Sequence, residues 1–343
     1  MQPRLLSLAT ATPPHVLDRQ TVTAFARARF GAEAERLLPI FANAGIERRR
    51  SCVPADWYAL PHGWEERSRL FVEHAVDLAA TATIEAIRRA SLSTDQVDAV
   101  VAVTTSGVCT PSLDALLMQR LRLRPDVIRL PVFGLGCGGG LLGLARAAAL
   151  AKAEPGSRVL LVVVEPCGLT VRVGDSSKSN IVATALFGDG AGSAILSCRG
   201  EGPRLTAWGE HTWPDTLDVM GWRIEDDGFG VLFSQDIPTL VRNRYRDALD
   251  LWLGRQGMSL ADMDGFALHP GGTKVVAALE AALGLAPGRL VIEREVLAEY
   301  GNMSAATLLF VLERLMAHPL PRRTLLGALG PGFTAGFMLM ERA

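Results

Sequence analysis

Three residues of this sequence have side chains that could cooperate in acyl chemistry: Cys137, His269 and Asn302. Cys137 lies among glycines at the start of an apolar segment, and a helix N-terminus there would lower the pKa of its thiol. A neighbouring imidazole would stabilise the thiolate, and N–H groups of His269 and Asn302 could bind a thioester carbonyl as it becomes an enolate. The combination predicts decarboxylation of a malonyl thioester followed by Claisen condensation, which requires no metal or redox cofactor.

Each of the three residues also has a purely structural interpretation. Cys137 could be a buried cysteine in a tight turn. His269, which precedes Pro270-Gly271-Gly272, could be a loop residue, and Asn302 could be a helix N-cap. The catalytic interpretation is favoured by the joint position of the three residues in an internal duplication.

The chain repeats one order of elements, and this order would bring the three residues together. The paired segments are helices over 76–90 and 241–255, strands over 99–103 and 265–268, helices over 141–151 and 305–316, and closing strands over 187–196 and 329–338. Alternating helices and strands predict crossover units and mostly parallel sheets covered by helices. Cys137 and Asn302 precede the second pair of helices, so they would face one another across a pseudo-twofold axis. We expect two halves, residues 1–202 and 203–343.

Bulk composition excludes several classes of protein. The 343 residues are 49% hydrophobic and 21% charged, which favours a large core. The formal net charge of -1 gives no basic field for nucleic acid, and no apolar run approaches the roughly 20 residues of a membrane span. The five cysteines form no CxxC pair, so disulfide scaffolds and metal sites are not predicted. Without a signal-peptide pattern, a cytoplasmic protein is expected.

The motifs around these residues resemble the type III polyketide synthases, the chalcone-synthase-like branch of the thiolase superfamily. The resemblance rests on segments 104–108, 135–140, 186–191, 268–272 and 299–304. It implies a homodimer and a thiolase-like duplicated α/β fold with five αβαβα layers. It also implies a triad in which Cys137 carries the starter and the growing chain, while His269 holds the thiolate and binds the thioester carbonyl together with Asn302.

The resemblance further implies positions in the substrate cavity. Phe187 matches a gatekeeper between the coenzyme A tunnel and the cavity, and Thr105 and Thr170 match residues of the cavity wall. The loop Gly330-Pro331-Gly332 matches a segment that shapes the cavity for cyclisation. A separate expectation comes from charge alone: Arg48, Arg49 and Arg50 could contact coenzyme A phosphates, although a solvated surface cluster would look the same.

The second gatekeeper is less regular. Val231 takes its position, although Phe229 or Phe233 would take it if the register slips. Small residues near the nucleophile, including Thr110 and Val231, would leave room for a long acyl group. The stretch 56–64 also resembles bacterial members that use fatty acyl starters. We therefore expect malonyl-CoA and a long-chain fatty acyl-CoA as substrates, and an alkylpyrone or alkylresorcinol as product.

Other activities stay open from the sequence. An aromatic starter, as in chalcone and stilbene synthases, is one alternative. A single condensation, as in β-ketoacyl-acyl-carrier-protein synthase III, is another, although those enzymes usually carry the histidine before Gln-Ala-Asn. A papain-like cysteine hydrolase would not account for the duplication. A non-catalytic acyl-CoA-binding homologue would have no need of all three triad residue types.

Overall fold

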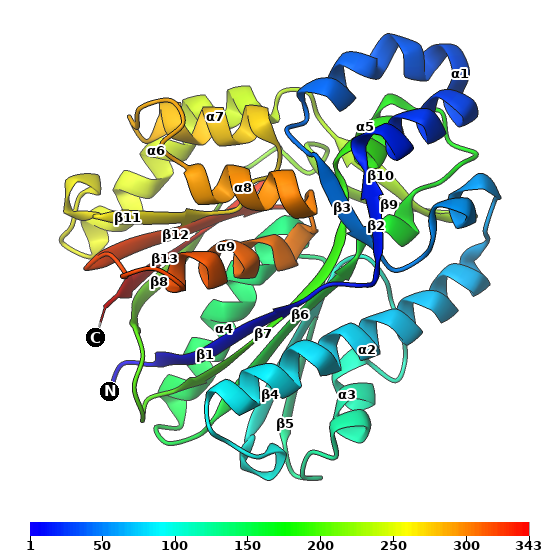
Figure 1. The fold of residues 1–343 in the computed structure, drawn as a ribbon. Coiled ribbons are helices and arrows are strands. Elements are labelled where there is room, and N and C mark those ends of the chain that lie inside the picture. Colours follow the sequence, from blue (N-terminus) through cyan, green and yellow to red (C-terminus); the bar gives the residue numbers. More distant parts are fainter. Residues whose placement is uncertain (343) are drawn as a thin grey trace.

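The computed structural model describes residues 1–342, which form a layered α/β fold around one large mixed sheet (Figure 1). The first elements are β1 (Arg4–Ala11), β2 (His15–Asp18), α1 (Arg19–Asn43), β3 (Arg48–Ser51), α2 (Trp64–Arg89), β4 (Ala99–Thr104), α3 (Leu113–Leu121), β5 (Ile128–Phe133), α4 (Gly139–Ala153), β6 (Val159–Pro166), α5 (Lys178–Leu186) and β7 (Asp189–Ser197). The later elements are β8 (Arg204–Thr212), β9 (Met220–Glu225), β10 (Gly228–Phe233), α6 (Ile237–Arg255), β11 (Gly265–Leu268), α7 (Thr273–Ala282), α8 (Val291–Tyr300), α9 (Thr307–Met316), β12 (Arg323–Gly330) and β13 (Thr334–Glu341). Short 3₁₀ turns between them include η2 (Thr94–Gln96), η3 (Gly136–Gly138), η4 (Cys167–Thr170), η5 (Leu260–Asp262) and η6 (Ser304–Ala306).

The nine strands of the large sheet follow the order β11-β12-β13-β8-β1-β7-β6-β4-β5. On the N-terminal side, β4 runs parallel to β6, and β7 and β1 continue antiparallel. On the C-terminal side, β11 runs parallel to β12, and β13 and β8 continue antiparallel. The two sets share one pairing pattern and meet where β1 and β8 pair at Arg4 and Arg204. The duplication predicted from the sequence is therefore confirmed.

Three apolar cores separate the layers of the fold. The first lies between the N-terminal strands and helices α2 and α3, and the third lies between β11 to β13 and helices α6 and α7. The second lies between the two sets of strands and is filled by α4 and α9. Because successive strand residues face opposite sides, Val100 of β4 packs in the first core and Val101 in the second. Helix, sheet, helix, sheet and helix give the five αβαβα layers that the resemblance implies.

The same local signal precedes the first paired strand of each half. Ser93 and Gln96 form a capping box around η2, before β4. Ser259 and Asp262 form the corresponding capping box around η5, before β11. In each box the serine hydroxyl accepts a hydrogen bond from the backbone N–H of the later residue, and the side chain of that residue accepts one from the serine N–H. The two bonds fix the turn that leads into the strand.

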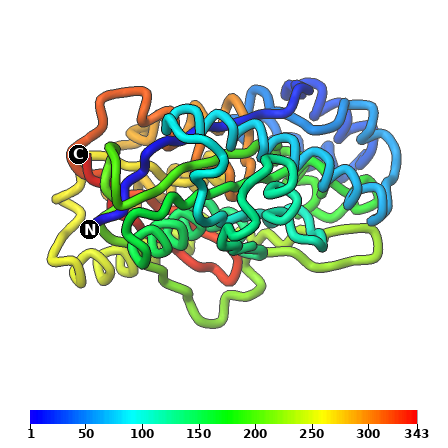
Figure 2. Tube along the Cα trace, turned by 90° about the horizontal axis from the view of Figure 1, so that it is seen from below, coloured from blue at the N-terminus to red at the C-terminus, as the bar shows by residue number. Residues whose placement is uncertain are grey.

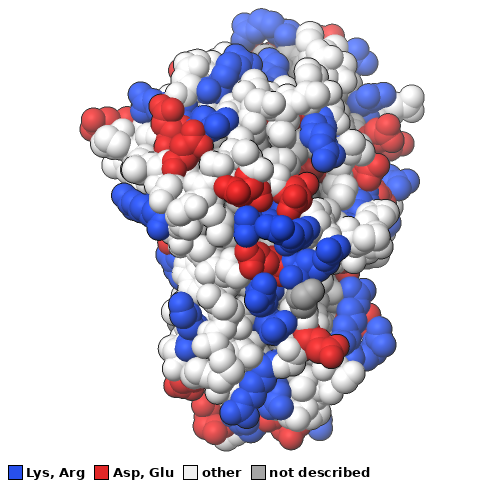
Figure 3. All heavy atoms as spheres, turned by 90° about the vertical axis from the view of Figure 1, so that its left-hand side faces the viewer, with Lys and Arg blue, Asp and Glu red and all other residues white. Residues whose placement is uncertain are grey.

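Two small two-stranded sheets lie outside the large sheet: β2 pairs with β3, which follows it after α1, and β9 pairs with β10 as a hairpin. Both chain termini lie at one end of the molecule, and α1 lies at the other (Figure 2). The face toward the termini carries basic and acidic side chains intermixed, without a field of one sign (Figure 3). Among the described residues, no helix has the length and apolar character that crossing a membrane requires.

Candidate active site

Cys137 lies in a glycine-lined turn between β5 and α4. It is the middle residue of η3, directly before the first turn of α4, and its side chain is buried. Gly136 has φ +47°, and a Cβ there would clash with the ring of Pro331. A Cβ on Gly330 would likewise clash with the Leu135 carbonyl. The turn therefore requires glycine, because backbone from the C-terminal half packs directly against it.

His269 and Asn302 come from the C-terminal half and are held by backbone hydrogen bonds. His269 directly follows β11, and its N–H donates to the Gly327 carbonyl at 2.8 Å. Asn302 lies between α8 and η6; its N–H donates to the Leu186 carbonyl at 2.8 Å, and its carbonyl accepts from the Gly188 N–H at 3.1 Å. Because Leu186 and Gly188 belong to the N-terminal half, these bonds join the two halves at the site.

The structure brings Cys137 and Asn302 together, with the Cys137 Sγ 4.0 Å from the Asn302 Oδ1. The Asn302 amide is held in one orientation, since Oδ1 accepts from the Ser304 N–H at 2.8 Å and Nδ2 donates to the Gly271 carbonyl at 3.1 Å. The Nδ2 group has two N–H donors, so one stays available for a ligand. The buried His269 ring has no hydrogen-bond partner on either nitrogen among residues 1–342.

Burial controls the protonation of the two titratable residues of this site. It raises the pKa of the Cys137 thiol to about 11, against smaller opposing contacts with Ser304 and Asn302. Burial also lowers the pKa of His269 to about 4, so that the imidazole is neutral at pH 7. The prediction that the helix N-terminus lowers the thiol pKa is therefore wrong, because desolvation of the thiolate outweighs the helix end. Both shifts favour the neutral form of the side chain, a thiol and an imidazole.

A buried carboxyl group, Glu165, lies close enough to Cys137 to affect its pKa, and the sequence motifs do not single it out. Its Oε2 accepts from the N–H groups of Thr105 and Ser106, both at 3.0 Å, and from the Ser106 hydroxyl at 2.6 Å. Burial raises the pKa of Glu165 to about 7, and its charge contributes to the raised pKa of Cys137. The signal in the sequence that could have indicated Glu165 is its position as an acidic residue directly after the apolar strand segment 159–164.

A cavity of about 310 Å³ opens beside Cys137. Its wall is formed by Thr105, Gly136, Cys137, Phe187, Met220, Gly221, Trp222, Val231, Phe233, Ser304 and Pro331. The predicted pocket residues in this wall are Thr105, Phe187, Val231 and Pro331. The β9–β10 hairpin supplies five wall residues, which makes this part of the wall mainly apolar. Met220 and Trp222 were not predicted, and no motif around them marks this role.

Comparison with known proteins identifies the family. Residues 60–200 match the N-terminal domain of the chalcone and stilbene synthases, and residues 205–342 match their C-terminal domain. The chain belongs to this family, the type III polyketide synthases. It is 36% identical to a 1,3,6,8-tetrahydroxynaphthalene synthase of Streptomyces peucetius, over 97% of this chain and 91% of that protein.

This type III polyketide synthase is also similar to a further relative in sequence and to a solved structure in fold. It is 29% identical to a 3,5-dihydroxyphenylacetyl-CoA synthase of Amycolatopsis balhimycina, over 90% of this chain and 86% of that protein. The crystal structure of a 1,3,6,8-tetrahydroxynaphthalene synthase from Streptomyces coelicolor superposes with a TM-score of 0.95 and 27% identity over 99% of both chains. The enzyme is accordingly an acyltransferase of the thiolase-like fold that condenses malonyl-CoA with decarboxylation.

The structure separates the three candidates for the second gatekeeper of the polyketide synthase. Val231 and Phe233 both lie in the cavity wall. The Phe233 ring packs edge-on against Phe187, with centroids 5.8 Å apart. Phe229 lies outside the wall, and its ring packs edge-on against Trp64 at 5.0 Å. Of the three candidates, Phe233 is thus the aromatic residue that packs against Phe187, and Val231 is a smaller residue of the same apolar cluster.

Several predicted pocket residues of the enzyme lie elsewhere. Thr110 is exposed in the loop between β4 and α3, so it does not line the cavity of the single chain. Thr170 is buried, but its hydroxyl donates to a carbonyl of its own turn, η4, at 2.7 Å. Gly330 and Gly332 are outside the cavity wall, because Pro331 between them takes the wall position. Gly330 instead packs tightly against the turn that carries Cys137.

The arginine cluster differs from the prediction at its central residue. Arg49 is buried, and its guanidinium donates to three backbone carbonyls at the end of α5, at 2.8 to 3.1 Å. These contacts contradict the expectation that Arg49 binds coenzyme A phosphates. Arg48 is exposed and lies 3.2 Å from Glu299. For Arg48 and Arg50, coenzyme A binding stays a prediction.

A second cavity, of about 410 Å³, shares Phe187 with the first. Its other apolar wall residues include Leu17, Val22, Phe25 and Val171. These residues come from the β2–α1 region and from the segment after η4. Phe187 therefore stands between the cavity beside Cys137 and a second, mainly apolar space.

Proposed function

We propose that Cys137, His269 and Asn302 are the catalytic triad of this type III polyketide synthase, and that Cys137 carries the starter and the growing chain. The observation that carries the proposal is the buried Cys137 thiol in the cavity wall, 4.0 Å from the Asn302 amide. His269 supports it, because both nitrogens of its buried ring are free of protein partners within residues 1–342. The chemistry needs no metal or redox cofactor, since coenzyme A thioesters are the substrates.

Loading and extension use the same groups. During loading, neutral His269 takes the Cys137 proton while the sulfur attacks the starter thioester; the bond to coenzyme A breaks, and the proton leaves with the coenzyme A thiol. During extension, N–H groups of His269 and Asn302 bind the malonyl thioester carbonyl, which becomes an enolate as carbon dioxide leaves. The enolate carbon attacks the Cys137 thioester and displaces its sulfur. The chain, longer by one malonyl-derived unit, is then on coenzyme A and can reload.

We further propose a long-chain fatty acyl-CoA starter and an alkylpyrone or alkylresorcinol product. The apolar wall contributed by Met220, Trp222 and Phe233 supports an alkyl substrate. The second cavity, which shares Phe187 with the first, offers apolar space for an alkyl tail. Apolar chains gain free energy roughly in proportion to the area that they remove from water, so longer starters should bind more tightly.

Mass spectrometry of products from malonyl-CoA and a panel of acyl-CoA starters tests the starter proposal. We expect longer fatty acyl starters to be preferred, and preference for an aromatic starter such as coumaroyl-CoA would contradict it. Relatives named 1,3,6,8-tetrahydroxynaphthalene synthase favour a second candidate product, a polyhydroxylated aromatic without an alkyl tail. Incubation with malonyl-CoA alone distinguishes that product. A single condensation onto malonyl carrier protein would indicate a synthase III-like activity instead.

We also propose that the enzyme is a homodimer. Val108, Ile128 and Phe133 are large apolar residues that are 45% to 49% exposed, and β5 is the edge strand of the large sheet. An exposed apolar edge of this kind is typical of a surface that another chain covers. Size-exclusion chromatography with light scattering should give the mass of two chains. A single-chain mass at micromolar concentration would contradict the proposal.

A further inference from the structure

The β9–β10 hairpin forms much of one cavity wall, yet it lies outside the large sheet. The two strands pair with each other in a separate two-stranded sheet. An isolated hairpin is marginally stable at best in water, so side chains of neighbouring elements must fix its position. These contacts determine how far the hairpin stands from Cys137, and therefore how much space a bound chain has.

Aromatic packing holds the part of the hairpin near the cavity. The Phe187 ring lies edge-on to Trp222 at 6.0 Å and to Phe233 at 5.8 Å. Further along β10, Phe229 packs against Trp64 of α2. Apolar burial is not directional, and these rings could slide over one another with little loss of buried area. The aromatic contacts therefore do not by themselves fix the distance between the hairpin and the nucleophile.

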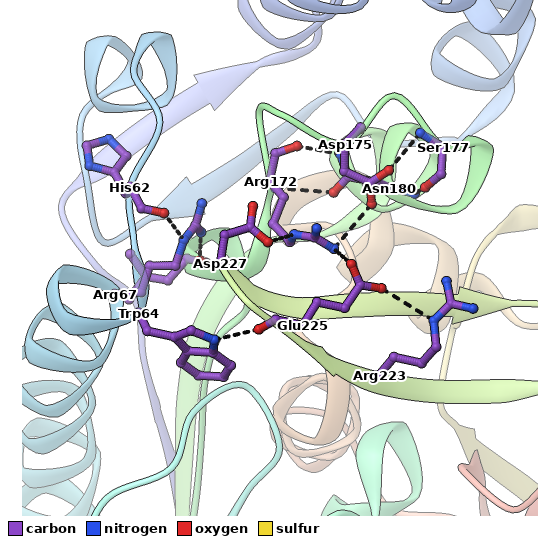
Figure 4. Close-up of polar contacts among 11 residues, drawn as sticks. His62, Trp64, Arg67, Arg172, Asp175, Ser177, Asn180, Arg223, Glu225 and Asp227 are labelled. Atoms are coloured by element: carbon purple, nitrogen blue, oxygen red, sulfur yellow. Dashed lines mark hydrogen bonds and ion pairs between the residues drawn. The ribbon is translucent and has the colours of Figure 1, made fainter.

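Charged contacts hold the tip of the hairpin (Figure 4). The guanidinium of Arg172 lies 2.7 Å from Glu225, the last residue of β9, 2.7 Å from Asp227 in the turn, and 3.4 Å from Asp175 of its own loop. The Arg172 side chain is 10% exposed, whereas Glu225 is 33% and Asp227 44% exposed. The contacts with Glu225 and Asp227 are ion pairs, and the attraction between opposite charges keeps the tip close to the guanidinium. They can fix the tip where the rings cannot.

The segment that carries Arg172 is itself held in place (Figure 4). The Asn180 side chain accepts from the Arg172 N–H at 3.2 Å and donates to the carbonyls of Arg172 and Asp175 at 2.7 and 2.6 Å. Helix α2 reaches the same tip, since the Trp64 Nε1 donates to the Glu225 carbonyl at 2.6 Å. The tip is thus held between α2 and the loop that leads into α5.

We propose that Arg172 is a positioning residue of the polyketide synthase: it clamps the tip of the β9–β10 hairpin and so limits the length of chain that Cys137 can carry. The inference rests on the proposed role of Cys137 in the cavity of about 310 Å³. Removing the guanidinium leaves the partly exposed Glu225 and Asp227 carboxylates without their cation, which favours movement of the tip into solvent. Because the hairpin is a separate sheet, it can move while the nine-stranded sheet stays intact.

Two variants test the clamp independently. Arg172→Met removes the guanidinium and keeps an apolar stem, whereas the double variant Glu225→Gln, Asp227→Asn removes both hairpin charges. The matched control is Arg223→Gln, since Arg223 is 65% exposed and lies 3.3 Å from Glu225 on the same hairpin. One readout is the rate at which N-ethylmaleimide alkylates Cys137, followed by peptide mass spectrometry. The other is the length of the products from malonyl-CoA and one acyl-CoA starter.

Both clamp variants should alkylate Cys137 up to about fivefold faster, the factor that corresponds to losing one partly exposed ion pair. They should also release products with at least one further malonyl-derived unit, while the control matches the wild type. Cys198, buried with its Sγ 3.8 Å from the Met1 carbonyl, reports global unfolding and should stay slowly labelled.

Unchanged alkylation in both clamp variants, or faster alkylation with unchanged product lengths, would overturn the proposal. The alkylation readout requires no substrate. A wild-type enzyme that fails to condense malonyl-CoA would therefore overturn the proposed function, while the alkylation rates would still test whether Arg172 holds the hairpin against the cavity. Faster labelling of Cys198 together with Cys137 would show that Arg172 supports the whole fold instead of the hairpin, and would also count against the clamp.

Discussion

The two sides of the cavity are built in different ways. Cys137, His269 and Asn302 lie on turns next to β5, β11 and α8, and backbone hydrogen bonds tie the last two turns to the rest of the fold. The opposite side is the β9–β10 hairpin, a separate two-stranded sheet held by side chains. Reacting groups must be held to within about 0.5 Å of a productive geometry, whereas a wall that only bounds a product can shift.

This difference predicts a division of effects. Substitutions on the reacting side, the turns that carry Cys137, His269 and Asn302, should change reaction rates and leave the range of products unchanged. Substitutions on the hairpin side should change the products and leave the chemistry of each step nearly intact. A hairpin variant that abolished every step, or a triad variant that only altered product length, would break the comparison.

The largest effect is expected for Cys137→Ala. This change removes the group proposed to carry the starter, so labelled malonyl-CoA should give no polyketide above background. Cys198→Ala is a matched control, because Cys198 is also buried and hydrogen-bonds to the Ala151 carbonyl at 3.1 Å, away from the cavity wall. The control should retain activity. Polyketide formation by Cys137→Ala at the wild-type rate would show that another group carries the chain.

Asn302→Ala should slow decarboxylation while loading continues. The change removes one of the two proposed donors to the developing enolate, and loss of such a donor costs about 10²–10³-fold in rate. Carbon dioxide release from malonyl-CoA measures this step, and the intact mass of the protein measures starter loading on Cys137. Equal loss of loading and of decarboxylation would mean that Asn302 mainly orders the site through its contacts with Ser304 and Gly271.

The sequence predicts the reacting side better than the hairpin side. Glycine turns and matched apolar segments reveal the duplication, and that frame places Cys137 near Asn302, as the structure confirms. The boundary between residues 202 and 203 stays a prediction. The thiol pKa was predicted in the wrong direction, since desolvation depends on everything that packs around a residue. Arg49 was misjudged for the same reason: three consecutive arginines look like surface charge until the α5 carbonyls are seen around one of them.

Trp222→Ala tests whether the hairpin wall of the cavity controls product length. Trp222 lies in the cavity wall and packs against Phe187, so its truncation enlarges the space beside Cys137. Products should gain malonyl-derived units, while the rate of starter loading stays within about threefold, because truncating an apolar wall residue leaves the proposed catalytic groups in place. Ile224→Ala is the matched control, since Ile224 is on the same strand and 80% exposed. Equal product lengths in both variants would argue against control by the hairpin.

The smallest effect is expected on stability, for Glu165→Gln. Burial raises the Glu165 pKa to about 7 from the 4.5 of a free side chain, so its protonated form is the one that the fold favours. The contribution of this raised pKa to the free energy of unfolding is fully present below pH 4.5 and is lost as the pH rises through about 7. Glutamine keeps an oxygen acceptor for Thr105 and Ser106 and cannot ionise. The free energy of unfolding of the variant, relative to that of the wild type, should therefore increase by on the order of 2 kcal/mol between pH 5 and pH 8.5. In a protein of this size that corresponds to about 3 °C in unfolding temperature, measurable by calorimetry at both pH values. A difference that is constant with pH would show that Glu165 is ionised at both, and would place its stabilisation in the hydrogen bonds at the end of β6.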